Sequence, residues 1–342
     1  MDEEQWQYAQ DNFSKDEIKE TLVEILMEYE PPYMEISEKE CLNDYRKLKG
    51  VKWNDLYVEK KWFARSEYKW PFSNSLIRRL NVGNKASNFF QQHNRWSVDG
   101  TISPGPIRTW NSEKFMYTLL GSLFTLKVAK VNRSVLRTCI SLRKYICSQF
   151  KPNVAKGIYD RYKCRNVLDF SAGWGDRLAG FYASDYGELY VGVDPKTENP
   201  PIYRQQAEFY EKHRTLFEGE RKCEFINEPA EDADLSKYEG MMDIVFTSPP
   251  YFSVERYSHD VNASSKGKEK SNLQICDPMN DYIDGIIDSE YVECFGMEMA
   301  KRPNCIGIGN AKVTDETNRK EEFIIEKEGD AFAEPVWVWK KR

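Results

Sequence analysis

The chain has 342 residues, of which 40% are hydrophobic and 14% aromatic, so it can bury a core and is not a disordered polymer. This length predicts roughly two domains. No apolar run approaches the roughly 18 residues that span a bilayer, and the first five residues are too acidic for a signal peptide. We therefore expect neither a membrane span nor a secretory signal.

Eight cysteines are scattered along the chain without CxxC spacing, and only three histidines accompany them. This pattern predicts no metal site and a reducing compartment.

A formal net charge of −6 disfavours a polyanionic partner on average, but the charge is distributed unevenly. The stretch from Lys127 to Arg165 holds eleven basic residues and a single acid, Asp160. Such a stripe can neutralise phosphates while the whole chain stays acidic. It can equally be a solvated helix face. The candidate nucleic-acid contacts within it are Arg137, Arg143 and Lys144.

Residues 1–149 are predicted to form a helical or irregular N-terminal region. Ser14 and Glu17 have capping-box spacing, and the helix that follows ends at Pro31. Over residues 50–112, aromatic residues alternate with cations that include Arg78 and Arg79. That mixture suits stacking on bases and contact with phosphates, which makes the region a candidate for nucleic-acid recognition. The same aromatics could instead form the core of a small irregular domain.

Residues 150–342 are predicted to form the second domain, an α/β unit with a Rossmann-like, doubly wound and mostly parallel sheet. The expected strands before the middle of this domain are 166–170, 189–193, 223–226 and 243–246, with helices at 175–184 and 202–217 between them. Later strands are expected at 305–308, 323–326 and 336–339. The last two of these are expected to form an antiparallel hairpin at the sheet edge, and the second half of the sheet looks reduced.

The loop after the first of these strands contains Gly173 and Gly175 and leads into a helix, an arrangement that lets a ligand approach the backbone and directs amides at an anion. Asp194 and Pro195 end the next strand, 25 residues after Asp169, where a carboxylate can accept the hydroxyl hydrogens of a ribose. Acids also follow the third strand. Glu231 and Asp232 are candidates to accept a hydrogen bond from an adenine amino group, with Asp232 slightly preferred, although both could belong to a solvated loop.

A strand that runs into Ser248-Pro249-Pro250-Tyr251 is the most specific feature of the sequence. The amino group of a base is a poor nucleophile, because its lone pair is delocalised into the ring. The Ser248 hydroxyl and the Pro249 carbonyl could each accept one N–H hydrogen and so aim the lone pair at an electrophile. Tyr251 could stack on a base that has left the duplex. The structural alternative is a simple proline turn after a strand.

Together these motifs fit S-adenosylmethionine better than a dinucleotide, because Leu178 stands where a dinucleotide fingerprint needs its third glycine. The chain resembles the S-adenosylmethionine-dependent amino-methyltransferases of the DNA N4-cytosine and N6-adenine class, and its overall look is similar to those of phages and large viruses. The matching stretches are 170–175, 247–251, 150–156 and the closing strand at 334–339.

The resemblance implies a seven-stranded sheet, S-adenosylmethionine as donor and a flipped base as acceptor. It places catalysis at Ser248, Pro249, Pro250 and Tyr251. It also implies a cofactor site formed by Pro152, Asp169, Phe170, Ser171, Gly173, Gly175, Asp194, Pro195, Glu231 and Asp232.

The predicted activity is methylation of a base in DNA, with cytosine N4 slightly favoured over adenine N6, in the cytoplasm or in the nucleus of a host cell. RNA as substrate and a catalytically silent nucleic-acid-binding subunit remain the alternatives. The sequence departs from the family by lacking a separate target-recognition domain after the catalytic motif, so recognition is expected in the N-terminal region.

Overall fold

The computed structural model describes residues 1–59, 75–78, 80–100, 103–144, 146–230, 232–246, 255–256, 293–297, 319–326 and 333–340. The chain forms two compact units. The first comprises Met1–Ile36, Gln91–Ser148 and Ser253–Ser258, and the second comprises the remainder. The described residues between 37 and 90 therefore group with the α/β unit, whereas the sequence places them in an N-terminal region ending at residue 149.

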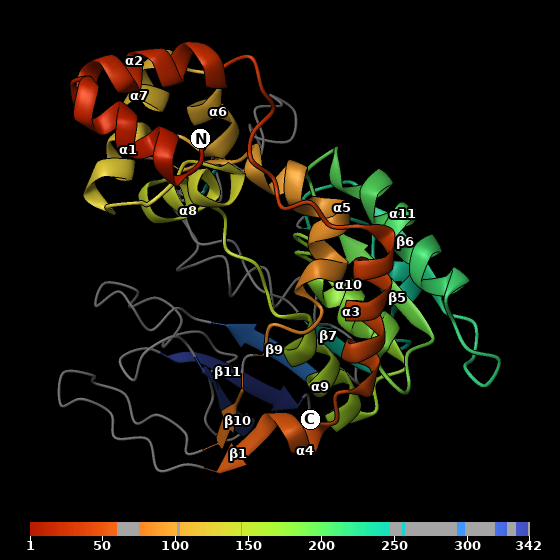
Figure 1. Ribbon diagram of the computed structural model, residues 1–342. Coiled ribbons are helices and arrows are strands. Elements are labelled where there is room, and N and C mark those ends of the chain that lie inside the picture. The colour runs from red at the N-terminus through yellow and green to blue at the C-terminus, as the bar shows by residue number, and fades with distance from the viewer. Residues whose placement is uncertain are drawn as a thin grey trace. The chain divides into compact units, whose positions relative to one another are not determined.

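Helices dominate the first unit (Figure 1). They are α1 (Glu3–Asn12), α2 (Lys15–Leu26), the second half of α5 (Asn84–Trp96), α6 (Pro106–Trp110), α7 (Glu113–Thr125) and α8 (Arg133–Arg143). The capping box at Ser14 and Glu17 is confirmed, because each side chain bonds the backbone amide of the other residue. Sequence reasoning missed α1, which has its own capping box between Asp2 and Gln5.

The core of the first unit is built from apolar stripes of these helices. It contains Trp6, Ile18, Leu22, Val23, Trp96, Trp110, Met116, Leu119, Leu120, Leu123, Val131, Leu136, Cys139 and Ile140. Trp96 lies in the aromatic and basic segment for which stacking on bases was one prediction, and it is buried here. In the second unit, Phe90 of the same segment packs against Phe209 and Tyr210. The described part of the segment therefore supports the core alternative at these positions.

In the described residues, the second unit is an α/β structure around a sheet of nine strands, in the order β1-β2-β10-β11-β9-β7-β4-β5-β6 (Figure 1). The strands are β1 (Tyr57–Glu59), β2 (Ser75–Ile77), β4 (Asn166–Asp169), β5 (Leu189–Val193), β6 (Lys222–Ile226), β7 (Ile244–Phe246), β9 (Glu293–Met297), β10 (Arg319–Glu326) and β11 (Ala333–Lys340). Its helices are α3 (Glu38–Gly50), α4 (Trp53–Leu56), the first half of α5, α9 (Pro152–Tyr162), α10 (Asp176–Ala183), α11 (Asn199–Lys212) and the short 3-10 helix η1 (Ser236–Tyr238).

The predicted fold class, a Rossmann-like doubly wound α/β sheet, is confirmed. β4, β5, β6, β7 and β9 run parallel, and the strand order reverses at β4, which pairs with β5 on one side and with β7 on the other. The resemblance implies seven strands, whereas the described sheet has nine, because β1 and β2 add to the seven that come from residues 166–340. The described second half, with β9, β10 and β11, is not reduced. The expected strand at 305–308 lies outside the described residues.

The C-terminal hairpin has the predicted antiparallel pairing, but it does not form the edge of the sheet. β11 pairs with β9 and with β10, both in antiparallel orientation. Beyond β10, β2 adds in parallel and β1 closes the sheet. β11 is an inner strand because it lies between β9 and β10, and β10 is not the edge because segments from the N-terminal half of the chain extend the sheet past it.

Alternate residues of the central strands face opposite sides, as a pleated strand requires. Leu168, Val191 and Val245 belong to one buried cluster, which the β6–β7 connection completes with Tyr238 and Met242. On the other side, Phe246 packs its ring against Tyr159 of α9, and Tyr159 in turn packs against Phe181 of α10. Both faces of the central strands are thus covered.

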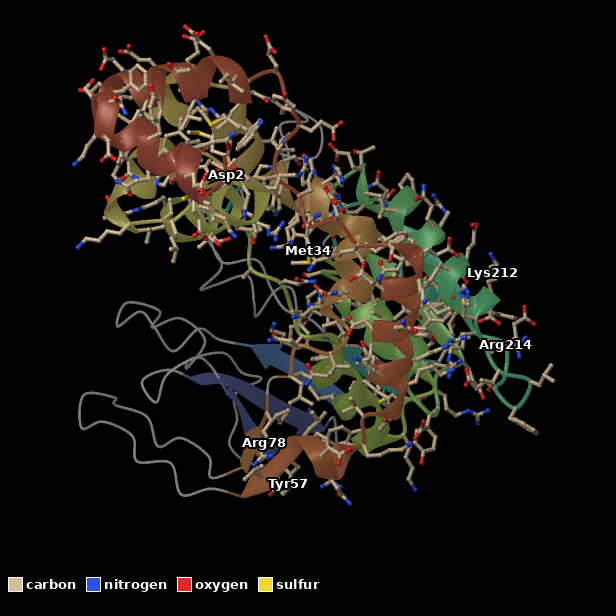
Figure 2. All side chains as sticks on the ribbon, viewed as in Figure 1. Asp2, Met34, Tyr57, Arg78, Lys212 and Arg214 are labelled. Carbon is tan, nitrogen blue, oxygen red and sulfur yellow. The ribbon has the colours of Figure 1, made fainter. Side chains whose placement is uncertain are left out.

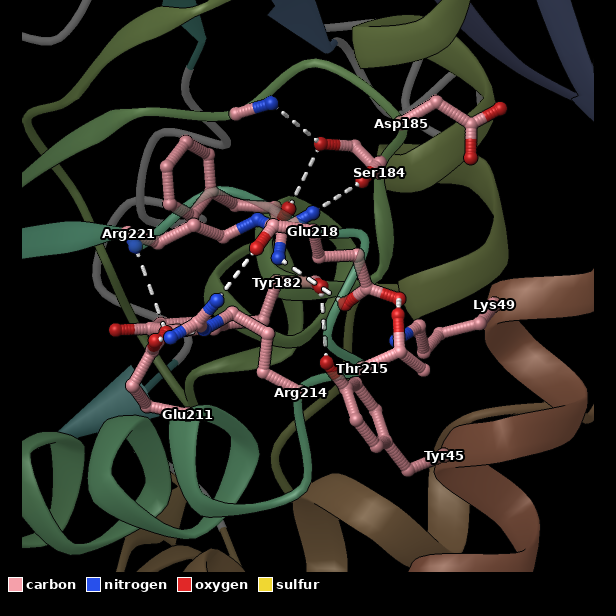
Figure 3. A network of polar contacts seen from close by, with 12 residues as sticks. Tyr45, Lys49, Tyr182, Ser184, Asp185, Glu211, Arg214, Thr215, Glu218 and Arg221 are labelled. Atoms are coloured by element: carbon pink, nitrogen blue, oxygen red, sulfur yellow. Dashed lines mark hydrogen bonds and ion pairs between the residues drawn. The ribbon is translucent and has the colours of Figure 1, made fainter.

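A polar network joins α3 to the sheet and its helices (Figure 3). Tyr45 donates to the carbonyl of Tyr182 at 2.9 Å, and Lys49 pairs with Glu218 in the α11–β6 loop. Arg221 completes the network by donating to the carbonyl of Ser184 at 2.7 Å. These contacts explain why residues 37–50 belong to the α/β unit. Among the described helices, none has the length and apolar character needed to cross a membrane.

Helices α9 and α10 cross at Gly180, where a Cβ atom would lie 2.8 Å from the Lys156 backbone nitrogen and 2.9 Å from the Pro152 carbonyl oxygen. We predict that Gly180→Ala lowers the free energy of unfolding by about 1–3 kcal/mol, because backbone atoms cannot move aside as a side chain can. Gly50→Ala is the control in the same unit, since a Cβ there meets nothing within 4 Å. Denaturant unfolding measures both, and equal midpoints for the two variants would contradict the prediction.

Candidate functional site

The carboxyl ends of three neighbouring parallel strands meet at one edge of the sheet. Asp169 of β4 pairs in register with Gly192 of β5, and Leu168 of β4 pairs with Val245 of β7. The strand order reverses between these pairs, and ligands of doubly wound sheets bind outside the carboxyl ends of the strands at such a reversal. The predicted cofactor loop follows β4 and the predicted catalytic motif follows β7, so both begin at this edge.

The loop between β4 and α10 depends on two glycines in the left-handed region, with φ of +63° at Gly173 and +68° at Gly175. A Cβ at Gly175 would collide with the Gln206 amide, which donates to the Gly175 carbonyl at 2.9 Å. A Cβ at Gly173 would meet nothing closer than 3.6 Å. Gly175 is therefore needed for packing as well as for its φ, while Gly173 leaves space beside the backbone.

Asp194 holds this loop to the end of β5. One carboxylate oxygen accepts from the Gly173 amide and from the Tyr203 hydroxyl, both at 2.9 Å, and the other accepts from the Lys196 amide at 2.9 Å. The residue is 7% exposed, and burial raises the pKa of Asp194 although these donors oppose the shift. The sequence assigns both oxygens to a ribose. In the structure both already accept from the protein, so a ribose would share or displace these donors.

Asp169 lies beneath the loop and is fully buried. Its carboxylate accepts from Arg177 Nε at 2.7 Å and from the Tyr190 hydroxyl at 2.6 Å. Burial by itself would lower the pKa of Arg177, but the charge and hydrogen bond of Asp169 raise it above its usual value. Arg177 also donates to the Ser171 carbonyl and lies over the Phe150 ring. The Asp169 carboxylate therefore accepts from other groups of the protein, and these contacts hold the start of the loop at the end of β4.

The other predicted cofactor residues lie around this loop in different environments. Phe170 is buried in the cluster with Leu168 and Val191, whereas Ser171 is partly exposed. Pro152 is buried at the first turn of α9. The remaining two described candidates, Pro195 after β5 and Asp232 after β6, are exposed, and Glu231 lies outside the described residues.

The predicted catalytic residues Ser248, Pro249, Pro250 and Tyr251 lie outside the described residues. The structure describes the strand that leads to them. Phe246, its last residue, is fully buried, and its ring packs edge-on against Phe150 and Tyr159. The chain that enters the motif is thus anchored in the core.

The predicted nucleic-acid contacts fall in both units. Arg137, Arg143 and Lys144 lie at α8 in the first unit, where Arg143 is exposed and Arg137 donates to the Tyr33 carbonyl. Lys144 lies over the Phe115 ring, and burial lowers the pKa of Lys144. Arg78 is exposed near Tyr57 in the second unit (Figure 2). Arg79 lies outside the described residues.

The basic stripe from Lys127 to Arg165 is not a continuous cationic surface. Lys156 is fully buried and pairs with Asp160, the single acid of the stripe, one helical turn away. Arg165 pairs with Glu188, and Arg133 pairs with Glu35. An i,i+4 pair within an apolar helix face can bury a lysine, which a count of charges does not reveal.

Sequence reasoning missed Arg177, Tyr203 and Gln206, three side chains that shape the loop. Tyr203 and Gln206 lie three residues apart on α11, with Tyr210 one turn further, and all three are buried. This polar and aromatic stripe on a helix that begins shortly after Asp194 is a signal that could have identified them.

No protein-family model matches the chain, and no curated protein matches it. Among solved structures, a methyltransferase from Geobacter sulfurreducens is 9% identical with a TM-score of 0.35, over 66% of this chain and 96% of that one. A candidate RNA methyltransferase from Pyrococcus horikoshii is 14% identical with a TM-score of 0.32, over 56% and 81%. A mutant of MtNAS in complex with S-adenosylmethionine is 11% identical with a TM-score of 0.33, over 90% and 100%. Similarity at these levels assigns no activity to this chain.

The buried ion pair beneath the loop can be tested against an exposed pair at the opposite end of the same strand. We predict that Arg177→Met lowers the free energy of unfolding by about 3–5 kcal/mol, because it leaves the Asp169 charge buried without its cation. Arg165→Met, which breaks the exposed pair with Glu188, should leave the unfolding midpoint nearly unchanged. Denaturant unfolding of both variants measures the difference, and a wild-type midpoint for Arg177→Met would contradict the prediction.

Proposed function

We propose that the protein transfers a methyl group from S-adenosylmethionine to the exocyclic amine of a flipped base in DNA, with cytosine N4 slightly favoured over adenine N6. The observation that carries the proposal is the pairing of β4 with β7 at the reversal of the strand order. Because β4 and β7 are neighbours, the glycine loop after β4 and the Ser-Pro-Pro-Tyr segment after β7 follow adjacent strand ends. One small molecule and one base can then meet at a single edge of the sheet.

The residues at this edge fit S-adenosylmethionine in chemistry. Gly173 leaves space beside its backbone, and the Asp194 carboxylate lies next to it. Their proposed roles are to admit the methionine end and to accept from the ribose, and Asp232 would accept from the adenine amine. S-adenosylmethionine, when bound, supplies a methyl group on a cationic sulfur. The charge of Asp169 is already balanced by Arg177, so Asp194 is the acid at the loop that could complement this cation.

The catalytic step is assigned to the residues that follow β7. Ser248 and the Pro249 carbonyl would accept the two N–H hydrogens of the amine, which aims its lone pair at the methyl group and stabilises the charge that grows on nitrogen. Two consecutive prolines limit the freedom of the carbonyl, because each fixes its own φ. Tyr251 would stack on the extruded base.

Two alternatives use the same fold. An RNA base is the first, and a silent nucleic-acid-binding subunit is the second. Nucleoside mass spectrometry after incubation of DNA and of RNA with the protein and labelled S-adenosylmethionine separates all three. Label in a methylated deoxynucleoside supports the proposal, and label in a ribonucleoside supports the first alternative. Binding of nucleic acid without transfer supports the second alternative.

The cofactor assignment predicts that Asp194→Ala weakens S-adenosylhomocysteine binding by about 10- to 100-fold, because a charge-assisted hydrogen bond to the ribose and the tether to Gly173 are both lost. The matched control is Asp243→Ala. Asp243 also accepts two backbone amides, those of Arg165 and Asn166, but at the opposite end of β4. Calorimetric titration measures both variants. Unchanged affinity in Asp194→Ala would remove the ribose assignment.

The catalytic assignment predicts that Ser248→Ala leaves the affinity for S-adenosylhomocysteine within twofold and lowers turnover by about 10²–10³-fold, the usual cost of one preorganised hydrogen-bonding group. Single-turnover transfer of labelled methyl measures the rate. A rate equal to that of the wild-type protein would mean that another group orients the amine.

A further inference from the structure

Tyr203 of α11 lies where two parts of the proposed cofactor site meet, the glycine loop after β4 and the acid after β5. Its hydroxyl contacts the Asp194 carboxylate at 2.9 Å and also the Gly173 carbonyl oxygen. The Gly173 amide donates to the same Asp194 oxygen at 2.9 Å. One tyrosine hydroxyl therefore joins a loop and an acid that follow different strands.

The position of this hydroxyl is set by the packing of its ring. Tyr203 is buried, and its ring centroid lies 5.2 Å from that of Phe225 on β6. Burial and the neighbouring charge of Asp194 raise the pKa of Tyr203 well above its usual value, so the hydroxyl keeps its hydrogen at neutral pH. Tyr203 is therefore a neutral donor that the core holds in place.

The orientation of the Asp194 carboxylate decides where its lone pairs point, because hydrogen bonds to a carboxylate oxygen lie near the plane of the group. Contacts on both oxygens oppose its rotation. The Lys196 amide donates to one oxygen, while Tyr203 and the Gly173 amide hold the other. Two of these three donors belong to the backbone, so the Tyr203 hydroxyl is the one that a conservative substitution can remove.

We propose that Tyr203 is a positioning residue for S-adenosylmethionine, which acts through Asp194 by holding the carboxylate in the orientation that accepts from the ribose. This inference rests on the proposed function. A carboxylate that is already held in place loses little freedom when the ribose binds, so its hydrogen bonds contribute more to affinity. The effect requires no contact between Tyr203 and the cofactor.

The test uses Tyr203→Phe, which removes the hydroxyl and keeps the ring that packs against Phe225. Tyr45→Phe is the matched control, because it removes another buried tyrosine hydroxyl of the same unit. The acceptor of that hydroxyl is the Tyr182 carbonyl, in the last turn of α10 and so at the opposite end of this helix from the glycine loop. Calorimetric titration with S-adenosylhomocysteine measures affinity, and denaturant unfolding measures stability.

We expect Tyr203→Phe to weaken binding of S-adenosylhomocysteine about three- to tenfold, the usual effect of one hydrogen bond. Tyr45→Phe should leave the affinity within about twofold of wild type, although both variants lower stability. In the Asp194→Ala background, Tyr203→Phe should change the affinity less than about twofold, because the group through which it acts is gone. A general role in packing the loop would persist in that background.

The pH dependence of binding provides a second measurement. Burial raises the pKa of Asp194 and the Tyr203 hydrogen bond lowers it, so loss of the hydroxyl should raise this pKa further. The ribose is expected to bind the charged carboxylate. The affinity of Tyr203→Phe should therefore begin to fall at a higher pH than that of wild type as the pH is lowered from about 8 to about 5. The charged side chains nearby on β4, α10 and the β5–α11 connection form ion pairs of their own, Asp169 with Arg177 and Lys196 with Glu198.

Wild-type affinity in Tyr203→Phe overturns the proposal, and so does an equal loss of affinity with and without Asp194. Should Asp194→Ala fail to fold or bind too weakly to titrate, the pH dependence decides. A shift to higher pH in Tyr203→Phe then supports the proposal, and a profile that matches wild type overturns it. Absence of binding by the wild-type protein counts against the proposed function and takes this inference with it. Binding without methyl transfer counts against the proposed reaction alone, because the role of Tyr203 is measured by affinity.

Discussion

The hydrogen bond from the Gly173 amide to the Asp194 carboxylate joins the ends of two neighbouring strands, and the rest of the site is arranged around it. The amide can point at Asp194 only if the loop turns through left-handed backbone, which glycine allows. Tyr203 from α11 holds the carboxylate in place, while Gln206 from the same helix fills the space that Gly175 leaves. One helix thus supports both sides of the loop.

Two acids at the carboxyl ends of neighbouring strands have different electrostatic environments. Asp169 is balanced by a buried guanidinium, so it contributes little net charge to the edge of the sheet. The described hydrogen bonds of Asp194 come from neutral groups, which orient a carboxylate without neutralising it. A cationic ligand would favour the charged form of Asp194 against the burial that raises its pKa. This difference suits a donor molecule whose reactive atom carries a positive charge.

Local signals in the sequence were sufficient where the deciding contacts are also local. The capping box at Ser14, the proline that starts α9 and the parallel strands β4, β5, β6 and β7 follow from spacing and composition alone, whereas the fifth parallel strand, β9, was not predicted. That the hairpin of β10 and β11 does not form the sheet edge could not be predicted, because it depends on the pairing of β10 with β2, a three-residue strand from the other half of the chain. A hydrophobic pattern identifies a strand but does not specify its neighbours.

Within the site, the sequence identified the loop and the acid after β5 but not the tasks that the side chains perform. Asp169 has the residue type and spacing of a ligand-binding acid, yet Arg177, eight residues later, pairs with it. Lys156 reads as part of a basic stripe until its partner Asp160 is placed beside it. In both cases the role of a charged residue depends on the side chain that lies beside it in the folded protein. A count of charges along the sequence does not show which side chains are paired.

The helical unit is assembled from three separate stretches of chain, and helix α5 begins in one unit and ends in the other. A unit built in this way cannot be gained or lost by fusing a gene fragment at either terminus, and no single cut in the backbone releases it. Deleting any one of the three stretches therefore removes part of the helical unit and leaves the rest of it incomplete.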